Sequence, residues 1–372
     1  MDRCDVLIVG GGPAGSSCAR ALRQAGLDVV VMDKAAFPRD KTCAGWITPA
    51  VIELLALDIE DYRQQRVFQP ISGFRTGVMD GPALETRHDH AVSYGIRRCE
   101  FDTYLLQRTD ARLRTAEPLT QLVRDADGWR VNASLQTPLI VGAGGHFCPV
   151  ARRLGADVGQ SELAVRAQES EFELDPAQRA ACRCQPGMPE LYFCKDLKGY
   201  GWCMRKGDFL NIGLGREGEP ALAQHVTAFR EFLGAAGRIP AGLQPRFKGH
   251  AYLLYRHARR TLLDDGVLLA GDAAGLACTE SGEGIRPAIE SGLMAAATIL
   301  QAQGRYSRAD LEPYRARLQA RFGPREARDW SAWLPQPVKS RLATGLMGNR
   351  WFVQHVLLER WFLHTQQPSL RI

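Results

Sequence analysis

A turn of small residues lies near the N-terminus and consists of Gly10, Gly11, Gly12, Pro13, Ala14 and Gly15. It follows an apolar run at 5–9 and precedes a small-residue stretch at 16–25, a second apolar run at 29–32 and then Asp33. This order predicts a β-α-β unit with a GxGxxG turn. Gly10 permits the tight turn, Gly12 lets the backbone approach a pyrophosphate, and Gly15 lets the helix pack closely against the strand.

The chemistry expected of this unit is the binding of a dinucleotide. The N-terminus of the helix offers unpaired N–H groups and the positive end of its dipole to phosphates. Asp33 is placed to accept hydrogen bonds from the hydroxyls of an adenosine ribose. Because strand, turn, helix, strand and acid occur in register, we expect a ligand here rather than a structural turn alone.

A second motif, at 271–275, puts Asp272 beside a glycine turn, after a buried strand at 266–270 and before a helix from 284 to about 303. Together with the first turn and Asp33, it resembles the FAD-binding sequence of single-component flavin monooxygenases, the p-hydroxybenzoate hydroxylase superfamily. The run 279–292 resembles the geranylgeranyl reductase branch more closely, although Thr279 stands where proline is usual. The resemblance covers nearly all of residues 1–300. It implies FAD, with Asp272 at the ribityl chain and the next helix facing the flavin pyrimidine.

Two further segments fit this branch. Arg98, followed by Phe101 and Asp102, resembles the arginine helix that meets FAD near its diphosphate, and the loop 41–45 resembles a cysteine-containing loop near the flavin. Cys43 is therefore a candidate catalytic residue, with an ordinary buried thiol as the alternative. The FAD-binding residues that the resemblance implies are Gly10, Gly12, Pro13, Ala14, Gly15, Asp33, Lys34, Lys41, Arg98, Gly271, Asp272, Gly282, Gly284 and Ile285.

The expected substrate pocket is aromatic. Tyr200 and Trp202 lie two residues apart, so they point to one face of a strand. They resemble the branch's substrate-pocket motif, in which a Phe-Pro pair is usual where this chain has Met204 and Arg205. Trp46 is expected to join them, whereas packing of core aromatics is the alternative for the strand pair.

The fold class expected is α/β: a Rossmann-like FAD-binding domain of the glutathione reductase type with an inserted antiparallel β-sheet substrate domain. The FAD-binding domain is expected at 1–65, 96–157 and 261–305, and the β-rich domain at 66–95 and 158–260. A helical C-terminal region is expected at 306–372, with aromatics at Trp330, Trp333, Trp351, Phe352, Trp361 and Phe362. These aromatics could pack on the body, roof the cavity, dock a partner or touch a membrane surface.

The reaction expected is flavin-dependent. We favour hydroxylation of a bulky aromatic or apolar substrate, either a natural product or a side chain of a partner protein. Reduction of a carbon–carbon double bond, as in geranylgeranyl reductases, is the alternative, and a non-catalytic flavin-bound sensor or scaffold is a third. No second dinucleotide fingerprint exists, and Gly144 stands where the superfamily has an aspartate. NAD(P)H is therefore a transient reductant, unless a separate reductase or a quinol supplies the electrons.

Composition excludes several other classes. The net charge is +6, but no basic run is interleaved with aromatics, so no nucleic-acid partner is expected. No metal site is expected, because the spacing of Cys182 and Cys184 matches no standard zinc ribbon. We interpret the ten cysteines as free thiols of a cytoplasmic protein. No leader and no transmembrane segment is expected, which leaves peripheral membrane contact open.

Overall fold

A computed structural model describes residues 1–158, 162–218, 221–325 and 344–371. Its first layer is a six-stranded sheet, and all but one of its strand pairs are parallel. The strand order is β19 (Leu263–Asp264), β20 (Val267–Leu269), β13 (Leu139–Gly142), β2 (Val6–Val9), β3 (Val29–Asp33) and β9 (Arg112–Thr115). Strands β2, β13 and β20 are buried at every residue, as expected of a parallel sheet covered on both faces.

Two helices that carry the cofactor motifs pack against this sheet and against each other. They are α1 (Pro13–Gln24) and α8 (Ile285–Ala302). A Cβ atom added at Gly292 of α8 would lie 2.2 Å from the Ala14 carbonyl oxygen of α1, so only glycine fits at this contact. The close approach aligns the N-termini of both helices at one edge of the sheet.

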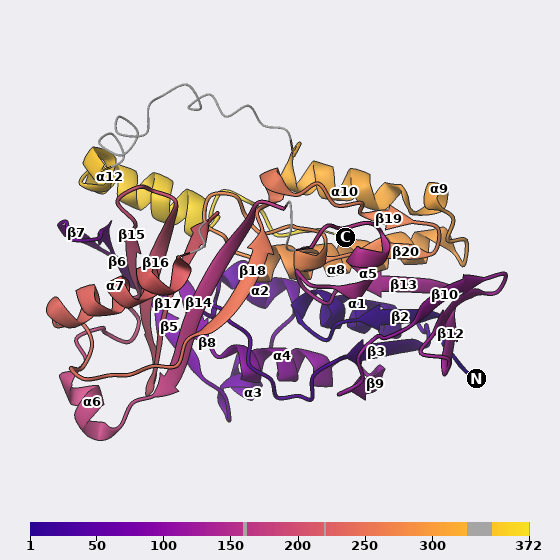
Figure 1. Ribbon diagram of the computed structural model, residues 1–372, viewed down its shortest axis with the longest axis horizontal. Helices are drawn as coiled ribbons and strands as arrows, with labels where there is room; N and C mark the ends of the chain where they lie inside the picture. The colour runs from indigo at the N-terminus through magenta and orange to yellow at the C-terminus, as the bar shows by residue number, and fades with distance from the viewer. Residues whose placement is uncertain (159–161, 219–220, 326–343, 372) are drawn as a thin grey trace.

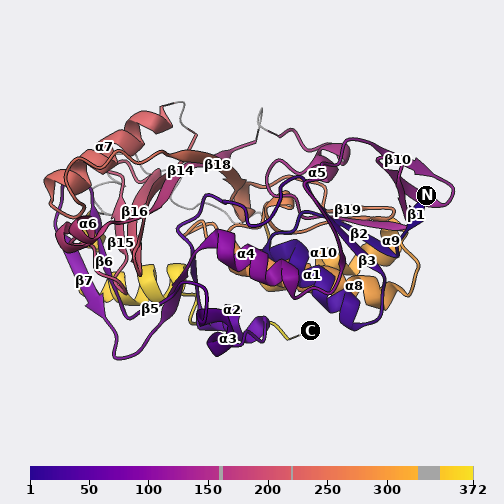
Figure 2. The same ribbon diagram turned by 90° about the horizontal axis from the view of Figure 1, so that it is seen from below.

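A seven-stranded sheet forms the second layer. Its order is β18 (Lys248–Leu253), β14 (Ala164–Glu173), β17 (Phe209–Glu217), β16 (Gly199–Lys206), β15 (Glu190–Phe193), β6 (Gly73–Val78) and β7 (Ala83–Arg87). All its pairs are antiparallel except β15 with β6. Helices α6 (Pro176–Ala181) and α7 (Leu222–Ala235) lie with this sheet at one end of the molecule, and the six-stranded sheet lies at the other (Figures 1 and 2).

Smaller elements connect and flank the two sheets. Strands β4 (Trp46–Ile47), β8 (Ser93–Ile96) and β5 (Phe68–Ile71) form a three-stranded sheet, and β1 (Asp2–Arg3), β12 (Leu135–Thr137), β11 (Gly128–Val131) and β10 (Leu122–Asp125) a four-stranded one. The connecting helices are α2 (Pro49–Leu54), α3 (Ile59–Arg63), α4 (Arg98–Gln107), α5 (Pro149–Arg153), η1 (Tyr255–His257) and η2 (Gly271–Ala273).

The described C-terminal region is largely helical, as predicted. It contains α9 (Arg308–Leu311), α10 (Pro313–Phe322), α12 (Arg350–Phe352) and a π-helix, η3 (Val353–Phe362). The yellow η3 runs back to the seven-stranded sheet (Figure 1), where Leu357, Leu358 and Phe362 share a core with Trp46 and Trp202. Trp330 and Trp333 lie outside the described residues. No described helix combines the length and apolar character needed to cross a bilayer.

The predicted α/β fold class with its inserted sheet is confirmed. Strands β10 and β11 form a hairpin, and the helix expected from 284 to about 303 is α8. Within 66–95, β6 and β7 join the seven-stranded sheet, whereas β5 and β8 pair in the three-stranded sheet with β4. All ten cysteines are free thiols in the structure.

Candidate functional site

A cavity of about 660 Å³ lies between the edge of the six-stranded sheet and the face of the seven-stranded sheet. Every predicted cofactor residue except Gly15 lines it, and so do Cys43, Trp46, Tyr200 and Trp202. The structure thus brings together residues from five distant parts of the sequence. Gly15 is the only predicted site residue outside the lining, and its role is to let a helix and a strand pack closely.

The glycines of the first turn serve different contacts. A Cβ atom at Gly15 would lie 1.9 Å from the Gly10 carbonyl oxygen, so Gly15 lets α1 approach β2. Gly10 has φ of 117°, and a Cβ there would lie 2.3 Å from the Ala143 carbonyl oxygen. At Gly12 an added Cβ would meet only side-chain atoms, the nearest being the Arg39 guanidinium at 3.4 Å. Gly12 therefore leaves a space beside an arginine.

The start of α1 fits a pyrophosphate. Its N-cap, Gly12, offers no side-chain hydrogen bond, and its first turn has no acidic residue. The first N–H groups of the helix thus face the cavity without a competing anion. Arg39 and Arg152 add positive charge to the lining. This donor set matches the phosphate groups of FAD.

Asp33 is fixed by the turn that it closes. One carboxylate oxygen accepts the Gly11 N–H at 2.8 Å, and the other accepts the Ala35 N–H at 2.9 Å. The Arg39 guanidinium lies 3.9 Å away. Each carboxylate oxygen can accept more than one hydrogen bond, so Asp33 can still bind ribose hydroxyls from its place at the rim, beside Lys34.

Arg98 is held rigidly at the base of the cavity. Its guanidinium donates two hydrogen bonds, of 2.8 and 2.9 Å, to the buried Asp102 one turn later on α4. Arg39 approaches the same carboxylate at 3.3 Å. Burial tends to lower the pKa of Arg98, but Asp102 more than offsets this and raises it, so the guanidinium stays charged. Two cations share one anion, which leaves net positive charge for an anionic ligand.

A second charged group forms where the two sheets meet. The Lys41 ammonium lies 2.5 Å from the His250 Nε2, and that nitrogen lies 3.4 Å from an Asp272 carboxylate oxygen. Burial lowers the pKa of Lys41 to about 8, and Asp272 partly opposes this. Burial would raise the pKa of Asp272, but His250, Lys41 and Arg98 outweigh it and hold that pKa well below the usual range. Asp272 is therefore an ionised acceptor at the position expected for ribityl hydroxyls.

The start of α8 faces the same cavity. Gly284 is its N-cap without a side-chain hydrogen bond, and a Cβ there would lie 3.4 Å from an Asp272 carboxylate oxygen. Gly282 has φ of 71°, and a Cβ at this residue would lie 2.5 Å from the Tyr252 hydroxyl. These glycines let the backbone N–H groups before Ile285 reach the cavity. They fit the carbonyl-bearing pyrimidine ring of a flavin.

The Cys43 loop is clamped by the seven-stranded sheet. Glu169 accepts the Cys43 N–H at 2.8 Å, and the Asn211 amide donates to the Cys43 carbonyl oxygen at 3.1 Å. Asn211 also donates to Glu169 at 3.0 Å and accepts the Trp202 indole N–H at 2.7 Å. Because both backbone groups of Cys43 are held, its side chain has a defined position in the cavity lining.

A buried lysine holds the next part of this loop. The Lys206 ammonium donates to the Ala44 carbonyl oxygen at 3.0 Å and to that of Ile96 at 2.9 Å, and it pairs with Glu171. A Cβ added at Gly45 would lie 2.7 Å from the same nitrogen. Since a buried ammonium requires an anion and acceptors, this group fixes the loop before Trp46.

One end of the cavity is aromatic, and the residues predicted for a substrate pocket lie there. The Tyr200 hydroxyl donates to the Ser281 carbonyl oxygen at 2.6 Å, so it ties the sheet to the loop before α8. Its ring centroid lies 6.2 Å from that of Trp202 and 5.4 Å from that of Phe362. Trp46 packs on Phe362 from the other side, at 5.8 Å. Phe362 thus closes this end from the C-terminal π-helix.

Several residues of the site were not predicted, among them Arg39, Asn211, His250 and Phe362. Arg39 lies two residues before Lys41, so the loop motif pointed to its neighbourhood. Asn211 and His250 belong to strands whose register against the loop is a tertiary feature. Phe362 was expected only among several C-terminal aromatics. Pairing of β14 with both β17 and β18 brings Asn211 and His250 to the loop.

Comparisons with known proteins agree with this geometry. A protein-family profile described as FAD binding domain matches residues 3–321. A menaquinone reductase of Mycolicibacterium smegmatis is 30% identical over 79% of this chain and 76% of its own. A chloroplastic geranylgeranyl diphosphate reductase of Oryza sativa subsp. japonica is 29% identical over 87% of this chain and 73% of its own. A geranylgeranyl bacteriochlorophyll reductase-like structure from Thermoplasma acidophilum superimposes with a TM-score of 0.78 at 19% identity, over 98% of both chains.

The family match spans most of the chain, and the cavity offers donors suited to each part of FAD. The cofactor is therefore FAD. The chain belongs to the FAD binding domain family and is an FAD-dependent oxidoreductase of the branch that includes the geranylgeranyl reductases.

Proposed function

We propose that this oxidoreductase reduces carbon–carbon double bonds in a substrate that carries an isoprenoid chain. The observation that carries the proposal is the closed aromatic end of the cavity, where Trp46, Tyr200, Trp202 and Phe362 surround the space next to the Cys43 loop. An apolar chain loses contact with water there, which favours its binding. The relatives support this class, because menaquinone and geranylgeranyl diphosphate both carry isoprenoid chains.

FAD, when bound, supplies the hydride chemistry at the meeting point of the two sheets. The chain's residues have three tasks. Asp33, Arg98 and Asp272 hold the cofactor, and the aromatic wall orients the double bond and excludes water. The third task is to supply the proton that must accompany a hydride when a double bond becomes saturated. We assign that proton to the Sγ of Cys43, whose backbone is fixed by Glu169 and Asn211.

The electrons come from NAD(P)H or another reduced donor that binds transiently. Hydroxylation, which the sequence favoured, remains the alternative prediction. Oxygen separates the two reactions, because hydroxylation consumes dioxygen and double-bond reduction does not.

The test is turnover of FAD-loaded protein with geranylgeranyl diphosphate and NADPH, followed by mass spectrometry. We expect each reduced bond to add two hydrogen atoms, with no uptake of oxygen. Cys43→Ser should slow substrate reduction and leave reduction of the bound FAD by NADPH unchanged. Loss of FAD reduction itself in Cys43→Ser would argue against a proton-donor role and for a role in cofactor binding.

A further inference from the structure

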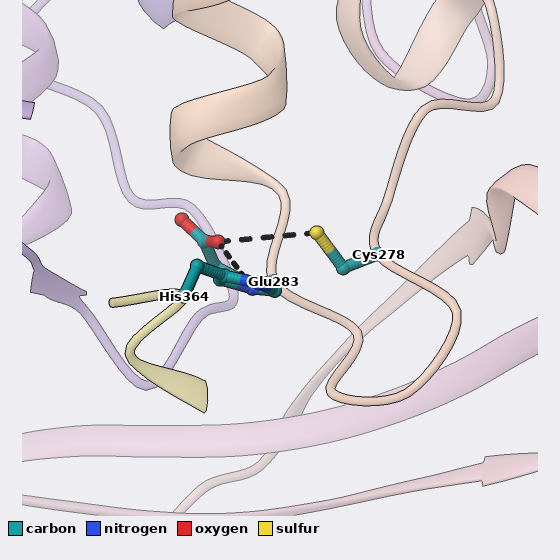
Figure 3. A group of neighbouring side chains, drawn as sticks. All are labelled: Cys278, Glu283 and His364. Atoms are coloured by element: carbon teal, nitrogen blue, oxygen red, sulfur yellow. Dashed lines mark hydrogen bonds and ion pairs between the residues drawn. The ribbon is translucent and has the colours of Figure 1, made fainter. Parts of the chain in front are cut away.

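Three side chains of metal-binding types converge at the edge of the cavity, which Glu283 helps to line. Cys278 and Glu283 belong to the loop before α8, and His364 follows η3 near the C-terminus. The Cys278 Sγ, one carboxylate oxygen of Glu283 and the Nε2 of His364 all lie within 4.8 Å of one another. Figure 3 shows the three groups pointing toward a common space. This group is the only one of its kind among the described residues.

The contacts within the group are poor hydrogen bonds. The Sγ of Cys278 lies 4.0 Å from the Glu283 oxygen, at the limit for a sulfur contact. The His364 Nε2 lies 3.2 Å from the same oxygen, yet this buried nitrogen has no aligned hydrogen-bond partner. Buried polar atoms are normally satisfied. The three donor atoms thus lie close together, while the His364 Nε2 makes no aligned hydrogen bond.

Backbone contacts fix the loop that carries Cys278 and Glu283, and the backbone at His364 has an unusual conformation. The Cys278 N–H donates to the Glu283 carbonyl oxygen at 2.8 Å, and the Gly282 N–H donates to the Cys278 carbonyl oxygen at 2.9 Å, so the loop is closed. The other carboxylate oxygen of Glu283 accepts the Arg286 N–H at 3.1 Å, which leaves the first oxygen available. His364 has φ of 49°, a left-handed conformation that is unusual for a non-glycine residue.

The C-terminal segment is held to α8 by a separate contact. The Arg286 guanidinium donates to the carbonyl oxygens of Gln367 and Pro368, each at 3.1 Å. His364 is therefore held beside the loop before α8 independently of its own side-chain contacts. The cluster lies at the junction between the segment that bears Phe362 and the loop that accepts the Tyr200 hydrogen bond.

We propose that Cys278, Glu283 and His364 bind one Zn²⁺ ion, with water as the fourth ligand. Zinc takes thiolate, imidazole and carboxylate ligands in tetrahedral sites, and three protein ligands with one open position is a common arrangement. A thiolate and a carboxylate together balance the two charges of the ion. The bound ion would join the C-terminal roof of the cavity to the loop before α8. This proposal is independent of the reaction that the enzyme performs.

The experiment is zinc analysis of the FAD-loaded chain by mass spectrometry, after removal of metal with a chelator and reloading with ZnSO₄. Wild type is expected to bind about one zinc per chain, as are the controls Cys99→Ser and His90→Gln. Cys278→Ser and His364→Gln should each weaken zinc binding by at least about 100-fold in competition with a chromogenic chelator, because even outer contacts of metal sites are worth 10- to 100-fold.

Retained FAD and an unchanged far-ultraviolet circular dichroism spectrum would show that each variant is folded. Cobalt loading gives a second readout, because tetrahedral Co²⁺ with a thiolate ligand absorbs at longer wavelengths than flavin. Wild type should show these bands, and Cys278→Ser should not. The proposal is overturned if reloaded wild type holds no stoichiometric zinc, or if both folded ligand variants bind zinc as tightly as wild type.

Discussion

The side-chain amide of Asn211 donates a hydrogen bond of 3.1 Å to the carbonyl oxygen of Cys43, across 168 residues of sequence. The same amide accepts the Trp202 indole N–H, so one side chain joins the aromatic residues of the cavity to the Cys43 loop. The positions of Trp202 and of the Cys43 loop are thus linked through a single buried residue.

Asn211→Leu should therefore affect both binding and stability. It leaves Trp202, Glu169 and the Cys43 carbonyl without this partner, and each unsatisfied buried group costs about 1–3 kcal/mol. We expect the free energy of unfolding to fall by at least about 2 kcal/mol, with a raised KM for substrate. Urea unfolding and steady-state kinetics measure these. The exposed control Gln185→Ala should change neither the free energy of unfolding nor the KM. Equal stability of Asn211→Leu and wild type would contradict the stabilising role of the Asn211 hydrogen bonds.

Gly15→Ala tests the packing of α1. The new Cβ would lie 1.9 Å from the Gly10 carbonyl oxygen, which cannot move without distorting the cofactor turn. We expect a loss of about 3 kcal/mol or more and no bound FAD after purification. Gly234→Ala is a matched control in α7, where an added Cβ meets nothing within 4 Å. It should stabilise the chain by about 0.5–1 kcal/mol. Flavin absorbance and thermal unfolding of the two variants provide the comparison.

Arg98→Lys tests the cation at the base of the cavity. Lysine cannot reproduce the two-pronged contact with Asp102 and presents a differently placed charge. Because hydrogen bonds to charged groups are worth about 1.5–3 kcal/mol, the affinity for FAD should fall about 10- to 100-fold. Fluorescence titration of apoprotein with FAD measures this change. The surface variant Arg63→Ala should bind FAD as wild type does, and an unchanged affinity in Arg98→Lys would remove Arg98 from the cofactor site.

Local sequence motifs explain the placement of the predicted cofactor residues, but not the contacts that strand register makes around the Cys43 loop. Gly10, Asp33 and Asp272 follow strands of one parallel sheet, so local motifs and the rule that strand ends meet at one edge suffice to place them. Asn211 and His250 act through the register of antiparallel strands paired across long sequence separations, and no local pattern reports that register. No local pattern predicts the cluster of Cys278, Glu283 and His364 either, because its members are separated by up to 86 residues.

Glu169 gives the chain a pH dependence. Burial raises the pKa of this carboxyl from 4.5 to about 7, with the Cys43 N–H opposing the change. Between these values the folded chain keeps a proton that the unfolded chain releases, so the contribution of Glu169 to the free energy of unfolding should fall by up to about 3 kcal/mol as the pH rises from 4.5 to 7. Glu169→Gln should remove this fall. Urea unfolding across that pH range measures it.

His146 changes the stability with pH in the opposite direction to Glu169, so it serves as a control for that measurement. Burial, together with the nearby Arg260, lowers the pKa of His146 from 6.5 to about 4. The unfolded chain binds the extra proton in this range, so this group makes stability rise with pH from about 4 to 6.5. Glu169→Gln should therefore show a net rise over this range, and His146→Gln a steeper fall than wild type. Identical pH profiles for both variants and wild type would refute the two assignments.

Anaerobic turnover tests the central claim most directly. FAD-loaded protein is reduced with dithionite in the absence of oxygen, mixed with geranylgeranyl diphosphate, and the product is analysed by mass spectrometry. We predict a product with two more hydrogen atoms for each reduced bond, together with reappearance of the oxidised flavin spectrum. An unchanged substrate under these conditions, with a hydroxylated product once oxygen is admitted, would contradict the proposed reduction.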